Sequence, residues 1–457
     1  MHMTRRDWLH KLGAGFGIAG LQGTLQGAVN PMAPKAPHFP AKAKHVIFLF
    51  LNGGISQVDT FDPKPALAKY DGTPMPGPKI KTDRASGSLM RSPWEFRKHG
   101  QSGIEVSDIF PHVARNIDSF CVIRSMYADT GNHGPSLQLM NCGHQLPGRP
   151  SMGAWVTYGL GTENQNLPGF VVLCPGFPVL GSSLWSNGYM PSLYQGVHIQ
   201  NSAVEPEKLI HHLRNTELSA DEQRHQLSLL EQINRKYLAR TGADTQLEGA
   251  VQTMESAFRL QAEATDVFDI RKEPEKIRAR YDISDFGRGC LLALRMVEKG
   301  VRMVQVYYGN GQPWDNHDDI RVHAKLAAKV DSPIAALIED LKARGLFEET
   351  IVIIGSEFGR TPMIQNSGLE KLGCGRDHNV PGFTYLLAGG GFKGGTTYGA
   401  TDEFGFKAVE NKVHVHDLHA TILHQLGFDH TKLTYRHAGR DFRLTDVHGN
   451  VVKALVS

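Results

Sequence analysis

The feature that most constrains the fold is a short, uncharged run of β-branched residues that ends abruptly in a polar turn. Residues 350–354 carry no charge, which is typical of a strand buried on both faces of a parallel sheet. Gly355 and Gly359 then bracket Glu357. In open α/β sheets ligands bind beyond the carboxyl ends of the strands, so Glu357 stands where a functional site is expected. The alternative is that Glu357 only caps the turn or pairs with Arg360.

Helices and further strands surround this unit in the sequence. Residues 331–347 carry apolar side chains at helical spacing and end near Gly345, which predicts an amphipathic helix. A closing helix is predicted over residues 415–427. Other strands are predicted over residues 44–51, 120–126, 301–308 and 383–388. The alternation in residues 301–308 indicates one partly polar face, and the whole pattern indicates an α/β fold with a mostly parallel sheet.

Composition excludes several classes of protein. The chain has 457 residues, 40% hydrophobic and 21% charged, which is enough for one large core with insertions. The net charge is only +3, and no nucleic-acid-binding motif is evident, so we expect no nucleic-acid partner. The five cysteines are widely spaced and form no CxxC motif, which argues against a disulfide framework or a cysteine zinc site.

The N-terminus differs from the rest of the chain. Arg5 and Arg6 precede a mildly apolar, Gly/Ala-rich run, and a linker rich in Pro, Ala and Lys follows. Residues 1–43 therefore resemble a twin-arginine export signal with its linker, which implies the twin-arginine export machinery as a partner and a periplasmic or extracellular location. The alternative is an amphipathic N-terminus without that role. No segment has the run of about 20 apolar residues that a transmembrane span requires.

We expect residues 44–457 to form a single domain with a helical insertion at about 205–295. This insertion is predicted because that region is charged, mostly helical in pattern, and interrupted by Gly242 and Pro274.

Polar side chains follow several of the predicted strands. Mixed carboxylate and imidazole ligands gathered from separate loops suit a divalent metal ion such as Zn, Ca or Mg. With 22 histidines, however, some pairs of histidine and acid arise by chance. The candidate metal ligands are Asp59, Asp315, His317, Glu357, Asp377 and His378.

A separate loop offers candidate nucleophiles. Residues 130–136 form a polar segment that leads into an apolar helix, and the start of a helix favours an anion. His133 and Ser136 are the candidates there, and a metal-bound water is the third choice for the attacking group. Alternatively, Ser136 is only a helix cap.

The order of these motifs resembles the sulfatase and alkaline-phosphatase-like superfamily. Residues 331–359 are similar to a helix and strand that end there in Ser-Asp-His-Gly, whose acid and histidine bind metal. Residues 378–381 are similar to a later metal-binding histidine that precedes a proline, and Asp315 and His317 fall where the superfamily supplies an Asp and a His. Residues 417–427 resemble the closing helix of sulfatases.

A narrower resemblance spans nearly the whole chain. Residues 48–65, 132–143, 314–317, 356–362 and 415–444 resemble the bacterial family known as domain of unknown function 1501. This resemblance implies the alkaline-phosphatase-like fold, a three-layer α/β/α arrangement around a mostly parallel central sheet. It implies no substrate.

Several positions depart from the superfamily pattern. Asn52 stands where the first metal-binding Asp is expected, Glu357 replaces an Asp, and Phe358 replaces the metal-binding His. No cysteine is present near His133 to supply a formylglycine.

Two hypotheses follow for the function. The first is an exported, metal-dependent hydrolase of small-molecule or polysaccharide phosphate or sulfate esters, in which Arg360 stabilises the extra negative charge. The second is a non-catalytic binding protein that retains the fold. A weaker third option is a hydrolase or transferase of another ester class.

Overall fold

The computed structural model of the chain describes residues 30–77, 82–209, 217–242, 251, 253–255, 257–260, 266–282, 284–365 and 373–457. Residues 1–29, which carry the predicted twin-arginine motif, lie outside these ranges. None of the helices within them is both long and apolar enough to cross a bilayer.

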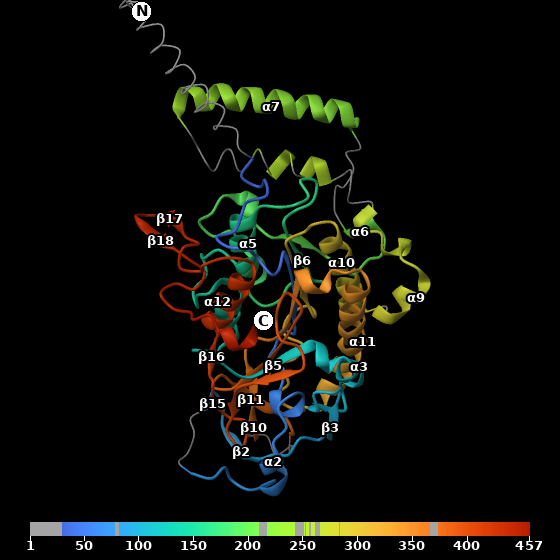
Figure 1. Cartoon of the computed structure of the whole chain (residues 1–457), viewed down its shortest axis with the longest axis vertical. Helices are drawn as coiled ribbons and strands as arrows, with labels where there is room; N and C mark the ends of the chain where they lie inside the picture. The colour runs from blue at the N-terminus through green and yellow to red at the C-terminus, as the bar shows by residue number, and fades with distance from the viewer. Residues whose placement is uncertain are drawn as a thin grey trace, which may run out of the picture.

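A large central sheet organises the molecule (Figure 1). Its strands run in the order β13-β5-β12-β9-β1-β8-β6-β7, and β16 also pairs with β5. All of these pairings are parallel except those of β12, which is antiparallel to both of its neighbours. The strands are β1 (His45–Phe50), β5 (Phe120–Tyr127), β6 (Phe170–Leu173), β7 (Val197–Ile199), β8 (Met303–Tyr307), β9 (Thr350–Gly355), β12 (Phe383–Ala388), β13 (Thr396–Tyr398) and β16 (Val413–His414).

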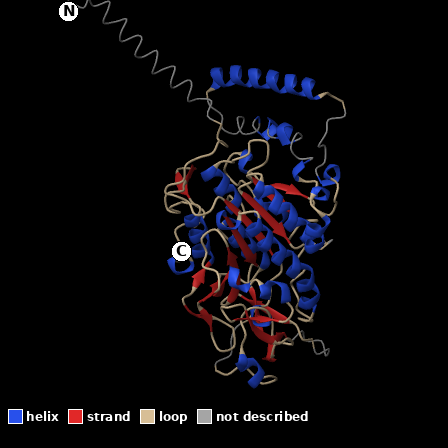
Figure 2. Ribbon diagram, turned by 45° about the vertical axis from the view of Figure 1, so that its right-hand side comes forward, coloured by secondary structure: helices blue, strands red, loops and turns tan. Residues whose placement is uncertain are grey.

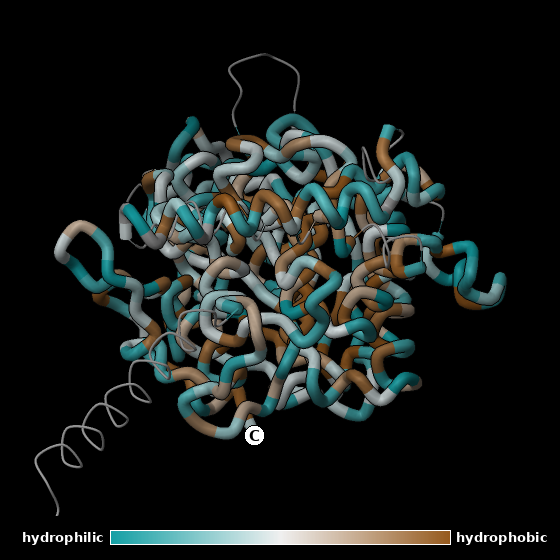
Figure 3. The backbone as a smooth tube through the Cα atoms, turned by 90° about the horizontal axis from the view of Figure 1, so that it is seen from above, coloured by the Kyte–Doolittle hydropathy of each residue, from teal (hydrophilic) through white to brown (hydrophobic). Residues whose placement is uncertain are grey.

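Helices cover both faces of this sheet (Figure 2). On one face α3 (Pro111–Arg115), α10 (Asp285–Glu298) and α11 (Val322–Ala343) share a core with Ile47 and Leu49 of β1. On the other face α4 (His133–Cys142), α5 (Met152–Leu160) and α12 (Val415–Gln425) share a core with Phe48 and Phe50. Alternate residues of β1 therefore point into two separate cores, and hydrophobic segments concentrate inside the molecule (Figure 3). The predicted three-layer α/β/α fold with a mostly parallel sheet is confirmed.

Strands β1 and β9 agree with the sequence analysis, and every residue of both is buried. The interpretation of residues 301–308 was wrong in one respect, because β8 is buried along its whole length. Its polar member, Gln305, donates a hydrogen bond to the Tyr307 hydroxyl (3.1 Å) and another to Asn141 (2.5 Å). A satisfied polar side chain can thus occupy a core position that alternation alone assigns to a polar face.

The central helix α11 begins at Val322, nine residues before the predicted start. The sequence Asp331-Ser332-Pro333 is typical of a helix start, but Asp331 caps the N-terminus of a different helix, α3. Its carboxylate accepts hydrogen bonds of 2.7 Å from the backbone N–H groups of His112 and Val113, at the start of α3. Asp331, which the sequence analysis took as the first residue of the helix, is therefore explained by a tertiary contact with α3.

A small antiparallel sheet packs at the carboxyl end of the central strands. It contains β2 (Ser86–Leu89), β10 (Gly359–Gln365) and β11 (Arg376–Asn379), in the order β11-β10-β2. In its register Arg360 lies opposite His378. The chain thus folds back directly after Glu357 and brings two predicted site segments side by side.

The remaining described elements lie around these layers. Residues 30–43, predicted as linker, run along the domain, where Lys35 and Phe39 bond to the backbone of Leu160 and Gly427. Helix α10, in the predicted insertion, packs on the central sheet. The other elements are α2 (Pro65–Lys69), β3 (Phe96–His99), β4 (Ile104–Ser107), α6 (Pro206–Leu209), α7 (Ala220–Thr241), α9 (Glu275–Arg278), β14 (Ala400–Thr401), β15 (Ala408–Glu410), β17 (Tyr435–His437) and β18 (Arg440–Phe442).

A buried ion pair network joins α10 to the end of α11. Glu273 is 8% exposed and accepts hydrogen bonds from Arg295 of α10 and from Arg344, which follows α11. Burial alone would raise the pKa of Glu273, but the two guanidinium groups outweigh burial and lower it.

We predict that Glu273→Gln lowers the free energy of unfolding by about 1–3 kcal/mol at pH 7, because two charge-assisted hydrogen bonds are weakened. A carboxyl group with a lowered pKa stabilises the fold above its unfolded pKa of about 4.3, and this contribution is lost as the pH falls through the folded pKa. Denaturant unfolding at pH 7 and pH 3 measures the difference. Glu403→Gln, at an exposed position, is the control; an equal Glu273→Gln effect at both pH values would contradict the prediction.

Candidate functional site

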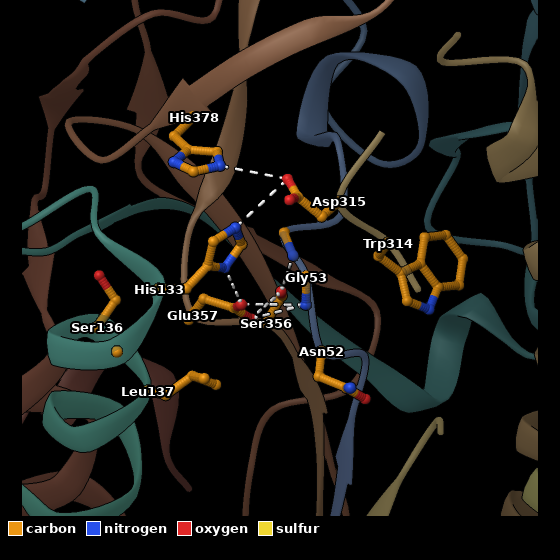
Figure 4. Close-up of polar contacts among 12 residues, drawn as sticks. Asn52, Gly53, His133, Ser136, Leu137, Trp314, Asp315, Ser356, Glu357 and His378 are labelled. Atoms are coloured by element: carbon orange, nitrogen blue, oxygen red, sulfur yellow. Dashed lines mark hydrogen bonds and ion pairs between the residues drawn. The ribbon is translucent and has the colours of Figure 1, made fainter. Parts of the chain in front are cut away.

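Four side chains from separate segments converge at the carboxyl end of the sheet. His133, Asp315, His317 and His378 each offer a ligand atom, and these atoms all lie within 4.8 Å of one another. His133 is the first residue of α4, Asp315 and His317 lie in the loop after β8, and His378 lies on β11. Figure 4 shows His133, Asp315 and His378.

The three imidazoles share one neighbour, the Oδ1 atom of Asp315. The distances from this oxygen to the Nε2 atoms are 2.8 Å for His317, 3.2 Å for His378 and 3.3 Å for His133. Only the His378 contact has hydrogen-bond geometry, and the buried Nε2 atoms of His133 and His317 have no hydrogen-bond partner among the described residues. Nitrogen lone pairs that converge without partners fit a metal ion.

Each imidazole is oriented by a contact of its other ring nitrogen. The Nδ1 atom of His133 lies 2.7 Å from a carboxylate oxygen of Glu357, and that of His378 lies 2.7 Å from the backbone carbonyl of Gly131. The Nδ1 atom of His317 contacts the amide oxygen of Gln365. Because these partners are acceptors, they favour the neutral tautomer that carries its proton on Nδ1, and in that tautomer the Nε2 lone pair can bind a cation.

Glu357 is fully buried and is not among the four converging residues. Its carboxylate accepts hydrogen bonds from the backbone N–H of Gly53 (3.0 and 3.1 Å), from the Ser356 hydroxyl (2.8 Å) and from His133. The structure places Glu357 behind His133, as its support.

Opposing charges set the protonation of the site. Burial alone would raise the pKa of Asp315, but the neighbouring imidazoles and the Arg360 guanidinium outweigh burial and hold it well below its usual range. Burial lowers the pKa of His378. Burial also acts to lower the pKa of His133, but Asp315 and Glu357 together raise it.

Arg360 is fully buried, and its guanidinium is engaged by the protein itself. It donates hydrogen bonds to the backbone carbonyls of Gly53, Gly54 (2.9 Å) and Trp314 (3.3 Å), and to Asp315 (2.6 Å). This arrangement fixes the two loops that carry the site.

Asp59 and Asp377 lie outside the converging group. Asp59 is buried in an ion pair with Arg376 (2.7 Å) and is not among the four converging residues. Asp377 is also buried, accepts from the backbone N–H of Arg84 (2.7 Å), and lies 3.9 Å from Nδ1 of His317. Its Oδ1 atom has no hydrogen-bond partner within the described ranges.

Ser136 is one turn into α4 and does not join the group. Its hydroxyl donates a 2.6 Å hydrogen bond to the carbonyl of Thr130, and the residue is buried. Asn132, and not Ser136, caps the helix, with its side chain accepting from the backbone N–H of Gly134 (3.2 Å).

The sequence analysis missed Gln365 and the carbonyl of Gly131. Gly131 could have been noticed, since it lies two residues before His133. No motif marks Gln365, which ends β10, and its contact with His317, in the loop after β8, arises only in the folded chain.

Comparisons with known proteins agree with the family resemblance. Residues 43–456 match the family described as "Protein of unknown function (DUF1501)". No curated protein matches the chain.

Several solved structures are distantly similar to this chain. The PsFucS1 sulfatase from Pseudoalteromonas sp. has 11% sequence identity and a TM-score of 0.34, with 85% of this chain and 68% of that chain covered. The lipoteichoic acid synthase LtaP from Listeria monocytogenes has 8% identity and a TM-score of 0.36, with 91% and 79% covered. The phosphonate monoester hydrolase of Agrobacterium radiobacter has 11% identity and a TM-score of 0.35, with 84% and 74% covered.

A substitution at Gly53 would test how tightly the loops of the site are packed. Its φ is +123°, and a Cβ atom there would lie 2.6 Å from the backbone N of Asp315 and 2.7 Å from that of Trp314. We predict that Gly53→Ala lowers the free energy of unfolding by more than about 1 kcal/mol, because backbone strain and a steric clash add together.

Gly77→Ala is the matched control for this substitution. Gly77 has a φ of +97°, but a Cβ atom added there would have no described atom within 4 Å. The Gly77→Ala variant therefore measures the cost of backbone strain without a steric clash. Thermal unfolding of the two variants measures the difference, and equal losses would contradict close packing at Gly53.

Proposed function

We propose that this chain, which belongs to the DUF1501 family, is a metal-dependent hydrolase of phosphate or sulfate esters. The observation that carries the proposal is the convergence of three imidazole Nε2 atoms on Asp315 Oδ1, with every Nδ1 atom held by an acceptor. We include export by the twin-arginine pathway to the periplasm or beyond, because of the Arg5-Arg6 motif.

The proposed metal ligands are Asp315, His317 and His378. Three ligands with one open position are the usual arrangement of a catalytic zinc site, and imidazole suits zinc better than it suits calcium or magnesium. When bound, the ion would act as a Lewis acid on the ester oxygen. Glu357 and Asp59 are left out of this set, because their carboxylates are buried in other contacts. Asp377 is left out because it is not among the four residues whose ligand atoms converge, although its Oδ1 atom has no hydrogen-bond partner within the described ranges.

The proposed nucleophile is His133. Its Nδ1 atom lies 2.7 Å from the carboxylate of Glu357. The Nδ1 atoms of His317 and His378 contact neutral oxygens, and the nearest carboxylates lie 3.9 Å and 3.6 Å from them. A carboxylate partner increases the electron density at Nε2 and stabilises the positive charge that forms during attack. Ser136 is less suited, because its hydroxyl is turned toward Thr130.

The proposed covalent step transfers the phosphoryl or sulfuryl group to His133. The Nε2 lone pair of His133 attacks phosphorus or sulfur, the ester P–O or S–O bond breaks, and the departing alcohol takes a proton from water. The hydroxide left by that proton transfer takes a proton from a second water as this water displaces the imidazole, which releases inorganic phosphate or sulfate. Throughout, the Nδ1 proton of His133 stays hydrogen-bonded to Glu357.

A non-catalytic metal-binding protein is the second candidate. The observation that favours it is the complete engagement of Arg360, whose guanidinium contacts carbonyls and Asp315 and is not presented to an incoming anion. Four ligands including His133 would also close a tetrahedral site, as structural zinc sites do.

We predict that His317→Ala and His378→Ala each lose one equivalent of bound divalent metal and reduce kcat/KM for 4-nitrophenyl phosphate or sulfate by about 100-fold. Removing a ligand opens the site to water and lowers metal affinity. Elemental mass spectrometry and steady-state kinetics give the two readouts. His225→Ala, at an exposed position on α7, is the control. Full hydrolysis by metal-free protein would overturn the metal-dependent mechanism.

We predict that His133→Gln abolishes hydrolysis while one equivalent of metal remains bound. Wild-type enzyme quenched during turnover of a radiolabelled aryl phosphate should carry label in an acid-labile, base-stable bond, as a phosphohistidine does. Metal lost together with activity in His133→Gln would instead make His133 a ligand and support the closed site of the second candidate.

A further inference from the structure

A hollow lies at the end of β5 and the start of α12, on the chain segment that leads into the converging histidines. Its volume is about 440 Å³, within the range of small-molecule sites. The polar and aromatic side chains that line it are Tyr127, Asp129, His414, Asp417, His448 and Asn450.

One short loop connects this hollow with the proposed reaction centre. Asp129 lines the hollow, the carbonyl of Gly131 contacts His378, and His133 begins α4. Four residues span at most about 14 Å when fully extended, so the Cα atoms of Asp129 and His133 are no farther apart than that. A substrate of two or three linked units is therefore long enough to span that distance.

The walls of the hollow are held in place by contacts with one another. The Asp417 carboxylate accepts hydrogen bonds from the backbone N–H groups of His414 (3.0 Å) and Asn450 (2.7 Å). Asp129 lies 3.2 Å from Nε2 of His414. These contacts join the end of β5, the start of α12 and the loop at residues 447–450, so the hollow is preorganised for a ligand.

Other groups in the hollow remain available to a ligand. Within the described part of the chain, the Tyr127 hydroxyl and the ring nitrogens of His448 have no hydrogen-bond partner. The Tyr127 ring packs edge-on against His414, with centroids 5.0 Å apart, and His448 stacks on His416 at 5.1 Å. The hollow thus combines aromatic surface with free donors and acceptors.

The charges of the hollow select against an anion. Asp129 and Asp417 both face it, and a phosphate or sulfate group would meet two carboxylates there. Carboxylates, an amide and a phenol instead suit neutral hydroxyl groups, and aromatic faces suit the apolar face of a sugar ring.

We propose that this hollow binds an uncharged sugar unit of the ester substrate, adjacent to the unit whose phosphate or sulfate group lies at the converging histidines. The inference rests on the proposed function and assigns its substrate class as an oligosaccharide or polysaccharide ester. The hollow then determines which ester is selected and takes no part in bond cleavage.

The test uses Tyr127→Phe and His448→Ala in the full-length protein, with His437→Ala, at an exposed position outside the hollow, as the control. Binding to an array of unmodified and sulfated oligosaccharides of three to six sugars identifies a ligand, and kinetics on that oligosaccharide ester are compared with kinetics on 4-nitrophenyl sulfate and phosphate. We expect each hollow variant to raise KM for the oligosaccharide ester about tenfold, because each loses one hydrogen bond to the ligand. Hydrolysis of the small aryl esters, which do not reach the hollow, should be unchanged.

The outcomes separate the two proposals. Oligosaccharide binding that weakens in the hollow variants, in a protein that hydrolyses no ester, would support the sugar site and overturn the hydrolase. Hydrolysis of aryl esters by a protein that binds no oligosaccharide, or whose hollow variants bind as the wild type does, would overturn the sugar site and leave the hydrolase standing.

Discussion

The buried carboxylate of Glu357 is the interaction on which the site depends. A fully buried carboxylate costs several kcal/mol unless donors surround it. Glu357 finds donors in the backbone N–H of Gly53, after β1, in the Ser356 hydroxyl, after β9, and in His133 at the start of α4. Satisfying this one charge therefore fixes the ends of two central strands and the first turn of a helix relative to one another.

Arg360 completes this arrangement with the opposite charge. Its guanidinium donates to the carbonyls of Gly53 and Gly54 on one side and to Trp314 and Asp315 on the other. The loop after β8 is thereby joined to the loop after β1. Arg360 lies opposite His378 in the small sheet, and its guanidinium also donates to the carbonyl of Arg376 on the strand of His378 (3.2 Å), so it links that strand to the loop of Asp315. The precision of the site thus comes from two buried charges beneath it.

The sequence was most informative where local pattern and tertiary environment agree. Residues 350–354 are uncharged and β-branched because both faces of β9 are buried, so the pattern alone predicts the strand and the place of Glu357 at its end. Asp331 and Asp59 show the opposite case. Their partners, the N-terminus of α3 and Arg376, are far away in the sequence, and nothing local distinguishes a supporting carboxylate from a metal ligand.

The contacts within the site could not be predicted from the sequence, for the same physical reason. Asp315, His317 and His378 lie together as expected from their loops, but Glu357 supports His133 instead of joining the group. A buried acid beside a histidine can orient the imidazole or bind a cation directly, and the choice depends on how many donors already surround it. That number is set by Gly53 and Ser356, which are brought to Glu357 only by the folded sheet.

Asn52 and Phe358, two positions where the superfamily resemblance led us to expect metal ligands, make structural contacts of their own. The Asn52 side chain donates its N–H groups to the carbonyls of Gly309 (3.0 Å) and Gly311 (2.6 Å), a role that an ionised Asp cannot perform because it only accepts hydrogen bonds. Phe358 is buried, and its ring lies against His133 and His378 with centroids 4.8 and 4.5 Å away. Asn52 stabilises a loop, and Phe358 packs against the imidazoles of His133 and His378. Asn52 therefore holds the loop after β8, and the Phe358 ring restricts the positions of two of the converging imidazoles.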